Sequence, residues 1–238
     1  MALDPQVRDK LRTVSTATLA TALFKRGLRS QFMQNVRPLR DYGATMVGEA
    51  YTLRYMPARE DLNEITVFRD RAHPQRKAVE ECPAGAVLVM DSRKDARAAS
   101  AGSILVTRLM QRGVAGVVTD GGFRDAAEIA RLDIPAFHTR PSAPTNLTLH
   151  QAIDINVPIG CGDAPVFPGD VIVGDGDGVI VLPAHLAAGL ADEAVEMTAY
   201  EDFVTEQVRG GRSILGLYPP TDEQNLTDFA AWRQRTGR

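Results

Sequence analysis

The order of apolar positions predicts strands alternating with helices through the first part of the chain. Continuous apolar runs such as Ala86–Met90 are typical of strands buried on both faces. Apolar residues at helical spacing between the runs predict helices, and Gly113 is a suitable helix stop. The expected strands are 44–53, 86–90, 115–119 and 135–138, and the expected helices are 4–26, 63–71, 73–81, 104–113 and 126–131. This alternation predicts a parallel sheet with right-handed crossovers.

The last third of the chain has a different pattern. Short β segments separated by Gly, Pro and Asp turns favour antiparallel pairing at 153–159, 166–167, 170–173 and 178–182. A helix is expected over 183–206. The expected fold class is therefore α/β, with a parallel sheet core plus an antiparallel β segment, in a single domain over 1–215. The tail at 216–238 is expected to pack on a neighbouring subunit through Phe229 and Trp232.

Composition and charge exclude several classes of function. The chain has 238 residues, 44% of them hydrophobic, which is enough for a sizeable core. Its net charge of −3 gives no basis for binding a nucleic-acid backbone. No apolar run approaches the roughly 20 residues that span a bilayer, and the N-terminus lacks a signal-peptide core. Cys82 and Cys161 match no metal or redox pattern. We expect a cytoplasmic protein that binds neither membranes nor nucleic acids.

One segment combines a buried strand, a glycine turn and two charged residues: Thr119-Asp120-Gly121-Gly122-Phe123-Arg124-Asp125. Ligands of parallel sheets bind beyond the carboxyl ends of the strands. A guanidinium can hold a carboxylate with two hydrogen bonds, and an Asp oxygen is a suitable ligand for Mg²⁺ or Mn²⁺. A 2-keto acid could thus chelate a metal while its carboxylate meets Arg124. On pattern alone, the segment could also be a simple turn with a capping Asp125 and a surface Arg124, with Asp120 bonding the glycine turn.

Three longer stretches, at 101–105, 112–125 and 166–179, resemble one family. This family joins the 4-hydroxy-4-methyl-2-oxoglutarate aldolases to the regulators of ribonuclease activity A, and the resemblance covers roughly residues 12 to 210. It implies a swivelling β/β/α fold of the RraA-like type and a homotrimer or a homohexamer. It also implies a divalent metal, Mg²⁺ or Mn²⁺, in an active site at a subunit interface.

The resemblance also assigns roles to individual residues. By analogy with the aldolases, Arg124 holds the substrate carboxylate and Asp125 positions the metal. Glu201 resembles a glutamate that the C-terminal helix contributes to a neighbour's catalytic site. The backbone amides of one turn would help to bind the substrate, and helix N-termini are general anion sites. This turn consists of Gly102, Ser103, Ile104 and Leu105.

Ser103 departs from the aldolase signature, which has an acidic residue at this position. Loss of a carboxylate that holds metal-bound waters can weaken metal affinity or activity by ~10–100-fold. Either another carboxylate takes its place or the chemistry of this subgroup differs. Ser103 could instead donate a hydrogen bond to the substrate.

The sequence therefore predicts a divalent-metal-dependent lyase of small 2-keto acids. Aldol cleavage releasing pyruvate is the main expectation, with oxaloacetate decarboxylation as a reaction of the same site. Dehydration of a 2-keto-3-deoxy sugar acid is an alternative, because it also begins with loss of a proton from C3. A second alternative is a non-catalytic protein that regulates a ribonuclease by binding it.

Overall fold

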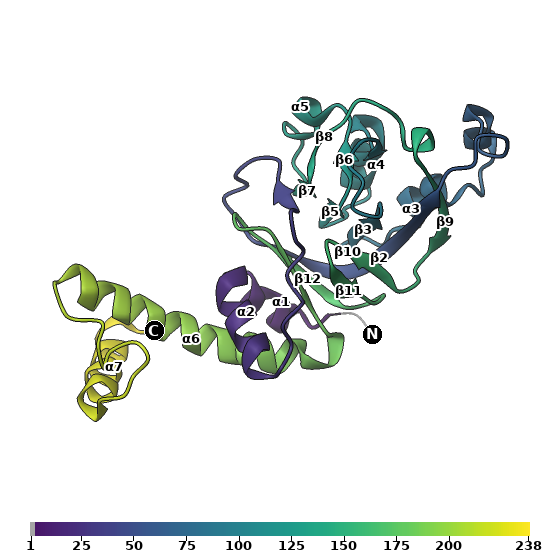
Figure 1. Ribbon diagram of the computed structural model, residues 1–238. Coiled ribbons are helices and arrows are strands. Elements are labelled where there is room, and N and C mark those ends of the chain that lie inside the picture. The colour runs from purple at the N-terminus through teal and green to yellow at the C-terminus, as the bar shows by residue number, and fades with distance from the viewer. Residues whose placement is uncertain (1–2) are drawn as a thin grey trace.

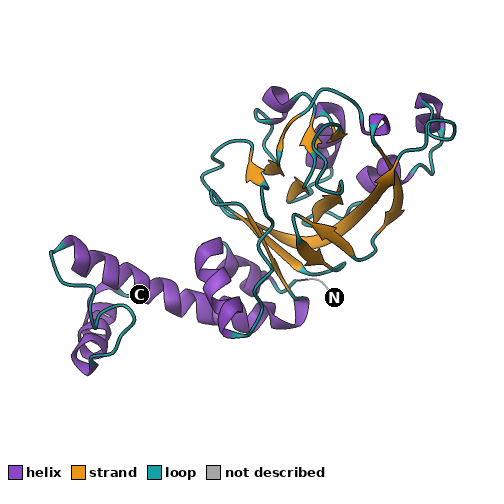
Figure 2. Cartoon of the chain, in the orientation of Figure 1, coloured by secondary structure: helices purple, strands orange, loops and turns teal. Residues whose placement is uncertain are grey.

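The computed structural model describes residues 3–238, and its largest element is an eight-stranded mixed sheet (Figures 1 and 2). The strand order is β1-β7-β5-β3-β2-β12-β13, with β9 paired to β2. The strands are β1 (Arg37–Pro38), β2 (Met46–Pro57), β3 (Val87–Asp91), β5 (Gly116–Thr119), β7 (Ala136–His138), β9 (His150–Ile155), β12 (Val171–Gly174) and β13 (Val179–Leu182).

The sheet has a parallel half and an antiparallel half, as the sequence predicts. β2, β3, β5 and β7 are parallel neighbours. The start of β2 pairs antiparallel with β12, and the end of β2 pairs antiparallel with β9. β2 is longer than predicted because it extends past Leu53 to reach β9. A separate antiparallel hairpin joins β10 (Ile159–Cys161) to β11 (Ala164–Val166).

A second, three-stranded parallel sheet lies beyond the carboxyl ends of the parallel strands. It consists of β4 (Ala99–Ala101), β6 (Gly122–Phe123) and β8 (Arg140–Pro141). The chain enters it after β3, β5 and β7 in turn. The passage from β5 to β6 needs Gly121, because a Cβ there would lie 2.7 Å from Ser92 Cβ. Because β6 contains Gly122, the small sheet brings the end of the glycine turn (Gly121-Gly122) next to the start of the helix at Ala126.

Two groups of helices pack on one face of the large sheet, whereas the core cluster on the other face includes residues of the β10–β11 hairpin and, within residues 3–238, none of a helix. α3 (Pro74–Glu81), α4 (Ser103–Gln111) and α5 (Ala126–Ile129) pack over the parallel half. α1 (Pro5–Leu11), α2 (Thr16–Lys25) and the start of α6 (Ala187–Arg209) pack against β12 and β13. Figure 1 shows these two groups of helices on different parts of the sheet.

Two of the helix predictions were wrong in detail. The single helix expected over 4–26 is α1 followed by α2, because Ser15 begins a new helix by accepting a hydrogen bond from Thr18 N at 3.0 Å. The helix expected over 63–71 is only a short 3₁₀ helix, η1 (Ile65–Arg69), without a buried residue. Two further 3₁₀ turns are η2 (Asn146–Thr148) and η3 (Ala184–Leu186).

The C-terminal part of the chain forms an arm, which we define as the end of α6, the following loop and α7 (Glu223–Thr236). The arm projects from the rest of the molecule (Figure 1). Its own small core contains Phe203, Leu217 and Trp232, with Phe229 packed against them. Phe229 and Trp232 thus pack on α6 of their own chain, while contact with a neighbouring subunit stays a prediction. No helix of residues 3–238 is long and apolar enough to cross a membrane.

Candidate active site

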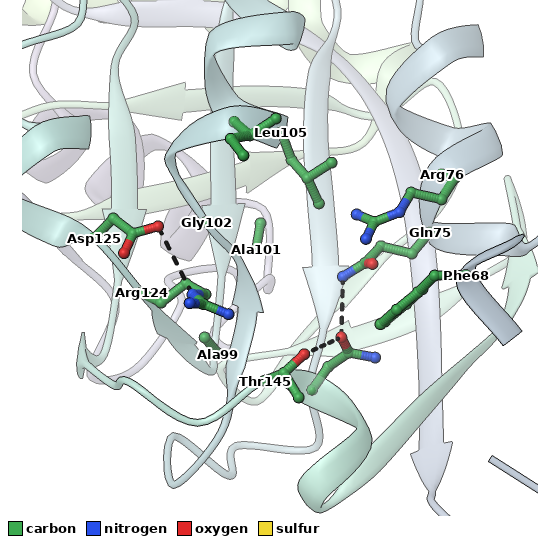
Figure 3. Close-up of a pocket in the computed structure, with 12 residues that line it drawn as sticks. Phe68, Gln75, Arg76, Ala99, Ala101, Gly102, Leu105, Arg124, Asp125 and Thr145 are labelled. Atoms are coloured by element: carbon green, nitrogen blue, oxygen red, sulfur yellow. Dashed lines mark hydrogen bonds and ion pairs between the residues drawn. The ribbon is translucent and has the colours of Figure 1, made fainter. Parts of the chain in front are cut away.

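A cavity of about 460 Å³ lies between the small sheet and α3. Figure 3 shows Arg124 and Asp125 on one side and Phe68, Gln75 and Arg76 on the other. The lining residues are Phe68, Gln75, Arg76, Ala99, Ala101, Gly102, Ile104, Leu105, Arg124, Asp125, Thr145 and Asn146. The structure therefore brings the predicted Arg-Asp pair and the predicted 102–105 turn together in one cavity.

Arg124 and Asp125 are held at the junction of β6 and α5. Arg124 N donates to Ala101 O at 3.1 Å, which ties the end of β6 to β4. Asp125 has a φ of 57°, in the left-handed region, and begins α5. Arg124 Nε lies 3.7 Å from Asp125 Oδ2, and both side chains are substantially exposed to solvent. The guanidinium therefore keeps donors available for a ligand.

Gly102 is required where β4 meets α4. A Cβ at this position would lie 2.7 Å from Arg124 Cγ and 3.0 Å from Asp125 Oδ2. The absence of a side chain therefore lets the two charged residues pass close to the start of α4. Gly102 cannot cap α4 with a side chain, and the carboxylate of Asp125 serves instead by accepting from Ser103 N at 3.3 Å.

The start of α4 keeps free backbone donors beside Arg124. Val106 N begins the helical pattern by donating to Gly102 O. Within the described chain, the N–H groups of Ile104 and Leu105 have no such partner. Two free amides at a helix N-terminus attract anions. Together with Arg124, these amides give one corner of the cavity the hydrogen-bond donors that an anion requires, and we call it the anion-binding corner.

Ser103 is half-buried and contacts Asp125 through two hydrogen bonds. Its hydroxyl donates to Asp125 Oδ2 at 3.3 Å, the same oxygen that accepts from Ser103 N. The other carboxylate oxygen, Oδ1, accepts no hydrogen bond from residues 3–238. Asp125 is also the sole carboxylate among the residues that line the cavity. Within residues 3–238, no other carboxylate lines the cavity in place of the acidic residue that the aldolase signature has at this position.

The opposite wall consists of residues that the sequence did not suggest. Gln75 Nε2 donates to Ser100 O at 2.6 Å, which fixes α3 against the small sheet. The guanidinium of Arg76 lies 4.3 Å from the centre of the Phe68 ring. A charged residue in a short polar helix is usually a surface residue, so its pattern gave no signal. The wall forms because α3 and the 3₁₀ turn η1 fold over the carboxyl ends of the strands.

Glu201 does not line this cavity. It lies on α6, where its carboxylate accepts from Thr18 Oγ1 at 2.8 Å and from Tyr218 OH at 3.2 Å. The same chain therefore does not bring Glu201 to Arg124 and Asp125. Its contribution to a neighbour's site stays a prediction.

Asp120 does not bond the glycine turn, contrary to expectation. Its carboxylate accepts from the backbone amides of Ser92, Lys94 and Gly162 at 2.7, 3.1 and 3.2 Å. Burial raises its pKa to about 6, and these hydrogen bonds partly oppose that shift. Thr119 Oγ1 instead accepts from Gly121 N. Asp120 therefore joins neighbouring loops and does not enter the cavity.

The donor set of the cavity fits Mg²⁺ or Mn²⁺ better than zinc. Among residues 3–238, no group of three or more His, Cys, Asp and Glu side chains is placed to hold a metal ion. Structural and catalytic zinc sites need three or four such ligands. Mg²⁺ takes one or two protein carboxylates and completes its shell with water and substrate oxygens. Asp125, with its free Oδ1, fits that second pattern.

Comparisons with known proteins give matches over most of the chain. A family model described as Aldolase/RraA, of the RraA-like type, matches residues 16–181. A protein of Halalkalibacterium halodurans is 32% identical over 193 residues, covering 81% of this chain and 84% of the relative. Its name proposes a 4-hydroxy-4-methyl-2-oxoglutarate aldolase. The 4-hydroxy-4-methyl-2-oxoglutarate aldolase of Thermus thermophilus is 32% identical over 119 residues, covering 50% of this chain and 71% of that protein.

A solved structure with a similar fold comes from Streptomyces coelicolor. It is RraAS2, described as an unusual member of the RNase ES inhibitor RraA protein family. The two chains superpose with a TM-score of 0.75 at 29% identity, over 85% of this chain and 97% of the other.

Proposed function

Because the chain belongs to the RraA-like family, we propose that it is a divalent-metal-dependent lyase of small 2-keto acids. We propose aldol cleavage that releases pyruvate, with oxaloacetate decarboxylation as a second reaction of the same site. One observation is the main support: Arg124, the free amides at the start of α4 and the carboxylate of Asp125 share one cavity. An anion-binding corner beside a metal-ligand carboxylate is what a 2-keto acid requires.

The carboxylate of the substrate would occupy the anion-binding corner. Arg124 offers forked donors, and the amides of Ile104 and Leu105 point from the helix terminus. These contacts orient the keto group toward Asp125. Binding through the part of the substrate that does not react leaves C3 and C4 over the open part of the cavity. Placement of this kind contributes to catalysis by removing the entropy cost of orientation.

Asp125 would hold Mg²⁺ or Mn²⁺ through its free Oδ1. A divalent cation there would supply Lewis-acid stabilisation of the negative charge that develops on the keto oxygen. Ser103 would orient the carboxylate by its hydrogen bond to Oδ2. This role resembles the outer-shell bonds that fix metal ligands in other sites.

The bond changes are the same in both proposed reactions up to the leaving group. The C3–C4 bond breaks, and its electron pair stays on C3. In aldol cleavage the C4 hydroxyl loses its proton as C4 becomes a carbonyl, whereas in decarboxylation C4 leaves as CO₂. A proton then adds to C3 and gives pyruvate. Of the lining residues, Asp125 is the sole one with a basic oxygen, so we propose that Glu201 of a neighbouring copy completes the site.

The likeness to the Streptomyces coelicolor protein favours a second candidate function, inhibition of a ribonuclease by binding. The two functions need different surfaces. An inhibitor has no need for a guanidinium, a carboxylate and free helix amides inside one cavity. The intact cavity therefore favours the lyase.

The direct test is turnover by the purified protein, with Mg²⁺ or Mn²⁺ and with EDTA. The substrates are oxaloacetate, 4-hydroxy-4-methyl-2-oxoglutarate and several 2-keto-3-deoxy sugar acids, with release of pyruvate and loss of water measured separately. We expect metal-dependent pyruvate release that Arg124→Ala lowers by ~100-fold or more. The matched control is Arg131→Ala, an exposed arginine outside the cavity. Metal-independent activity, or full activity of Arg124→Ala, would overturn the proposal.

A complementation experiment tests the interface site. Arg124→Ala and Glu201→Ala are each purified and then refolded together. If neighbouring copies share the site, the mixture contains sites with both native residues and recovers part of the activity. If one chain forms the whole site, the mixture is as inactive as its parents.

A further inference from the structure

Arg76 is a second cation of the cavity, on the wall opposite Arg124 (Figure 3). Its side chain is half-buried, and its guanidinium stacks over the ring of Phe68 at 4.3 Å. Two other arginines near this end of the fold, Arg97 and Arg108, form ion pairs with Asp95 and Glu80. Within residues 3–238, Arg76 has neither an ion pair nor a side-chain hydrogen bond.

The charge of Arg76 has lost part of its hydration without gaining a counter-ion. Burial lowers the pKa of this guanidinium, because partial desolvation disfavours the charged form. A positive charge in such a place gains free energy when an anion binds to it. The guanidinium lies over the Phe68 ring, and its N–H groups remain available for hydrogen bonds to a planar carboxylate.

The wall beside Arg76 is polar and already fixed in place. Gln75 is 3% exposed and Asn146 is 2% exposed. Gln75 Nε2 donates a hydrogen bond to Ser100 O, and Asn146 Nδ2 donates one to His150 O. Gln75 Oε1 is buried without any hydrogen-bond partner in the described chain. A buried acceptor of this kind is costly unless a donor reaches it. In this wall, the guanidinium of Arg76 therefore lacks an anion to pair with, and Oε1 of Gln75 lacks a hydrogen-bond donor.

We propose that Arg76 is the residue that binds the second carboxylate of a 2-keto dicarboxylic acid, and that Gln75 Oε1 accepts a hydrogen bond from a hydroxyl of its distal half. This inference rests on the proposed function, because it assumes that Arg124 binds the first carboxylate. A 2-keto acid with a single carboxylate would leave Arg76 unpaired. The cavity of about 460 Å³ has room for a chain that extends from one wall to the other.

Arg76 is thus a specificity-determining residue, and its effect should depend on the far end of the substrate. Hydrogen bonds to charged groups are worth enough to change affinity about 10- to 100-fold when one is removed. The same substitution should have almost no effect on a ligand that lacks the second carboxylate. The difference between the two ligands separates a binding role of Arg76 from a structural role, because a structural defect would weaken the binding of both.

The test is calorimetric binding of 2-oxoglutarate and 2-oxobutanoate to the full-length protein with Mg²⁺. The first ligand has two carboxylates, the second has one, and neither can undergo aldol cleavage. Arg76→Ala should weaken the affinity for 2-oxoglutarate about 10- to 100-fold and change the affinity for 2-oxobutanoate by less than about 2-fold. Arg76→Lys should retain part of the affinity. Arg69→Ala, an exposed arginine of η1, is the matched control.

The outcomes distinguish this inference from the proposed function. The second-carboxylate site is wrong if Arg76→Ala weakens the binding of both ligands equally or leaves the binding of both unchanged. It is also wrong if the native protein binds neither ligand. If the native protein binds 2-oxoglutarate through Arg76 but converts none of the substrates above, the lyase is wrong and the site stands. Steady-state kinetics provides the second readout. With Arg76→Ala, kcat/KM should fall for 4-hydroxy-4-methyl-2-oxoglutarate and stay unchanged for a 4-hydroxy-2-keto acid without the second carboxylate.

Discussion

Ser103 donates both its backbone N–H and its hydroxyl to the same oxygen of Asp125, each at 3.3 Å. The residue that departs from the aldolase signature is therefore in direct contact with the proposed metal ligand. A serine orients that carboxylate but brings no negative charge of its own. An acidic residue at this position would instead hold waters of a bound cation.

Ser103→Asp should raise the affinity for Mn²⁺ by ~10–100-fold, because it restores an outer-shell carboxylate beside Asp125. Without metal, the same substitution should lower the midpoint of thermal unfolding, because two carboxylates would lie close together. Mn²⁺ titration followed by electron paramagnetic resonance measures the affinity. Ser103→Asn is the control of similar size without the charge. An unchanged affinity in Ser103→Asp would contradict the assignment of Asp125 as the metal ligand.

Gly102→Ala should lower kcat/KM by roughly 100-fold or more while the protein stays folded. The new Cβ would lie 2.7 Å from Arg124 Cγ and 3.0 Å from Asp125 Oδ2, so both side chains must move. A displacement of about 1 Å at a reacting site can cost this much activity. The cost in stability should be about 1–3 kcal/mol.

The matched control is Gly189→Ala on α6, where nothing lies within 4 Å of the added Cβ. This variant should be as active as the native protein and slightly more stable, since alanine is favoured over glycine in a helix. Normal activity in Gly102→Ala would show that the close approach of Gly102 to Arg124 is not needed.

The parts of the site that could be predicted from sequence lie close together along the chain or carry a turn signal. Arg124 and Asp125 follow a glycine turn, and a strand ending in such a turn places the next residues at the sheet edge. The small sheet was not predicted, because strands of two or three residues such as Gly122–Phe123 are too short to show a period. Arg76 was missed for another reason, since only the tertiary fold brings α3 across the cavity.

Stability should fall on acidification partly through His138. Its side chain is 7% exposed and stacks on Phe123 with ring centroids 5.6 Å apart. Burial lowers the pKa of His138 to about 4, whereas the unfolded chain keeps the ordinary value of about 6.5. Between these values the unfolded state binds more protons, so the stabilisation present above pH 6.5 is lost as the pH falls toward 4. The loss amounts to about 3 kcal/mol at most.

His138→Leu removes this contribution to the pH dependence. The free energy of unfolding of the native protein and the variant should be measured by urea denaturation from pH 7.5 down to 4.5. The difference between them should shift by up to about 3 kcal/mol in favour of the variant as the pH falls. His150, whose pKa burial also lowers to about 4, is present in both proteins and cancels in the difference. A difference that stays constant with pH would show that His138 is not protonated on unfolding.

The arm should unfold before the rest of the chain. Its core is small and separate from the clusters under the large sheet, and it consists of Phe203, Val204, Leu217 and Trp232. Trp232 is the one tryptophan of the sequence, and its Nε1 donates to Glu206 at 2.8 Å. Tryptophan fluorescence therefore reports on the arm alone, whereas far-ultraviolet circular dichroism reports mainly on the main body.

In a urea titration, the fluorescence transition should come at a lower denaturant concentration than the dichroism transition, because local stability follows the size of the local core. Trp232→Phe should leave the midpoint of the dichroism transition unchanged. Leu88→Ala should lower this midpoint, because it reduces the free energy of unfolding of the main core by about 2–5 kcal/mol. Coincident transitions would mean that the arm is coupled to the body. Higher protein concentration provides a further check, since packing of the arm on a neighbouring subunit would move the fluorescence transition upward.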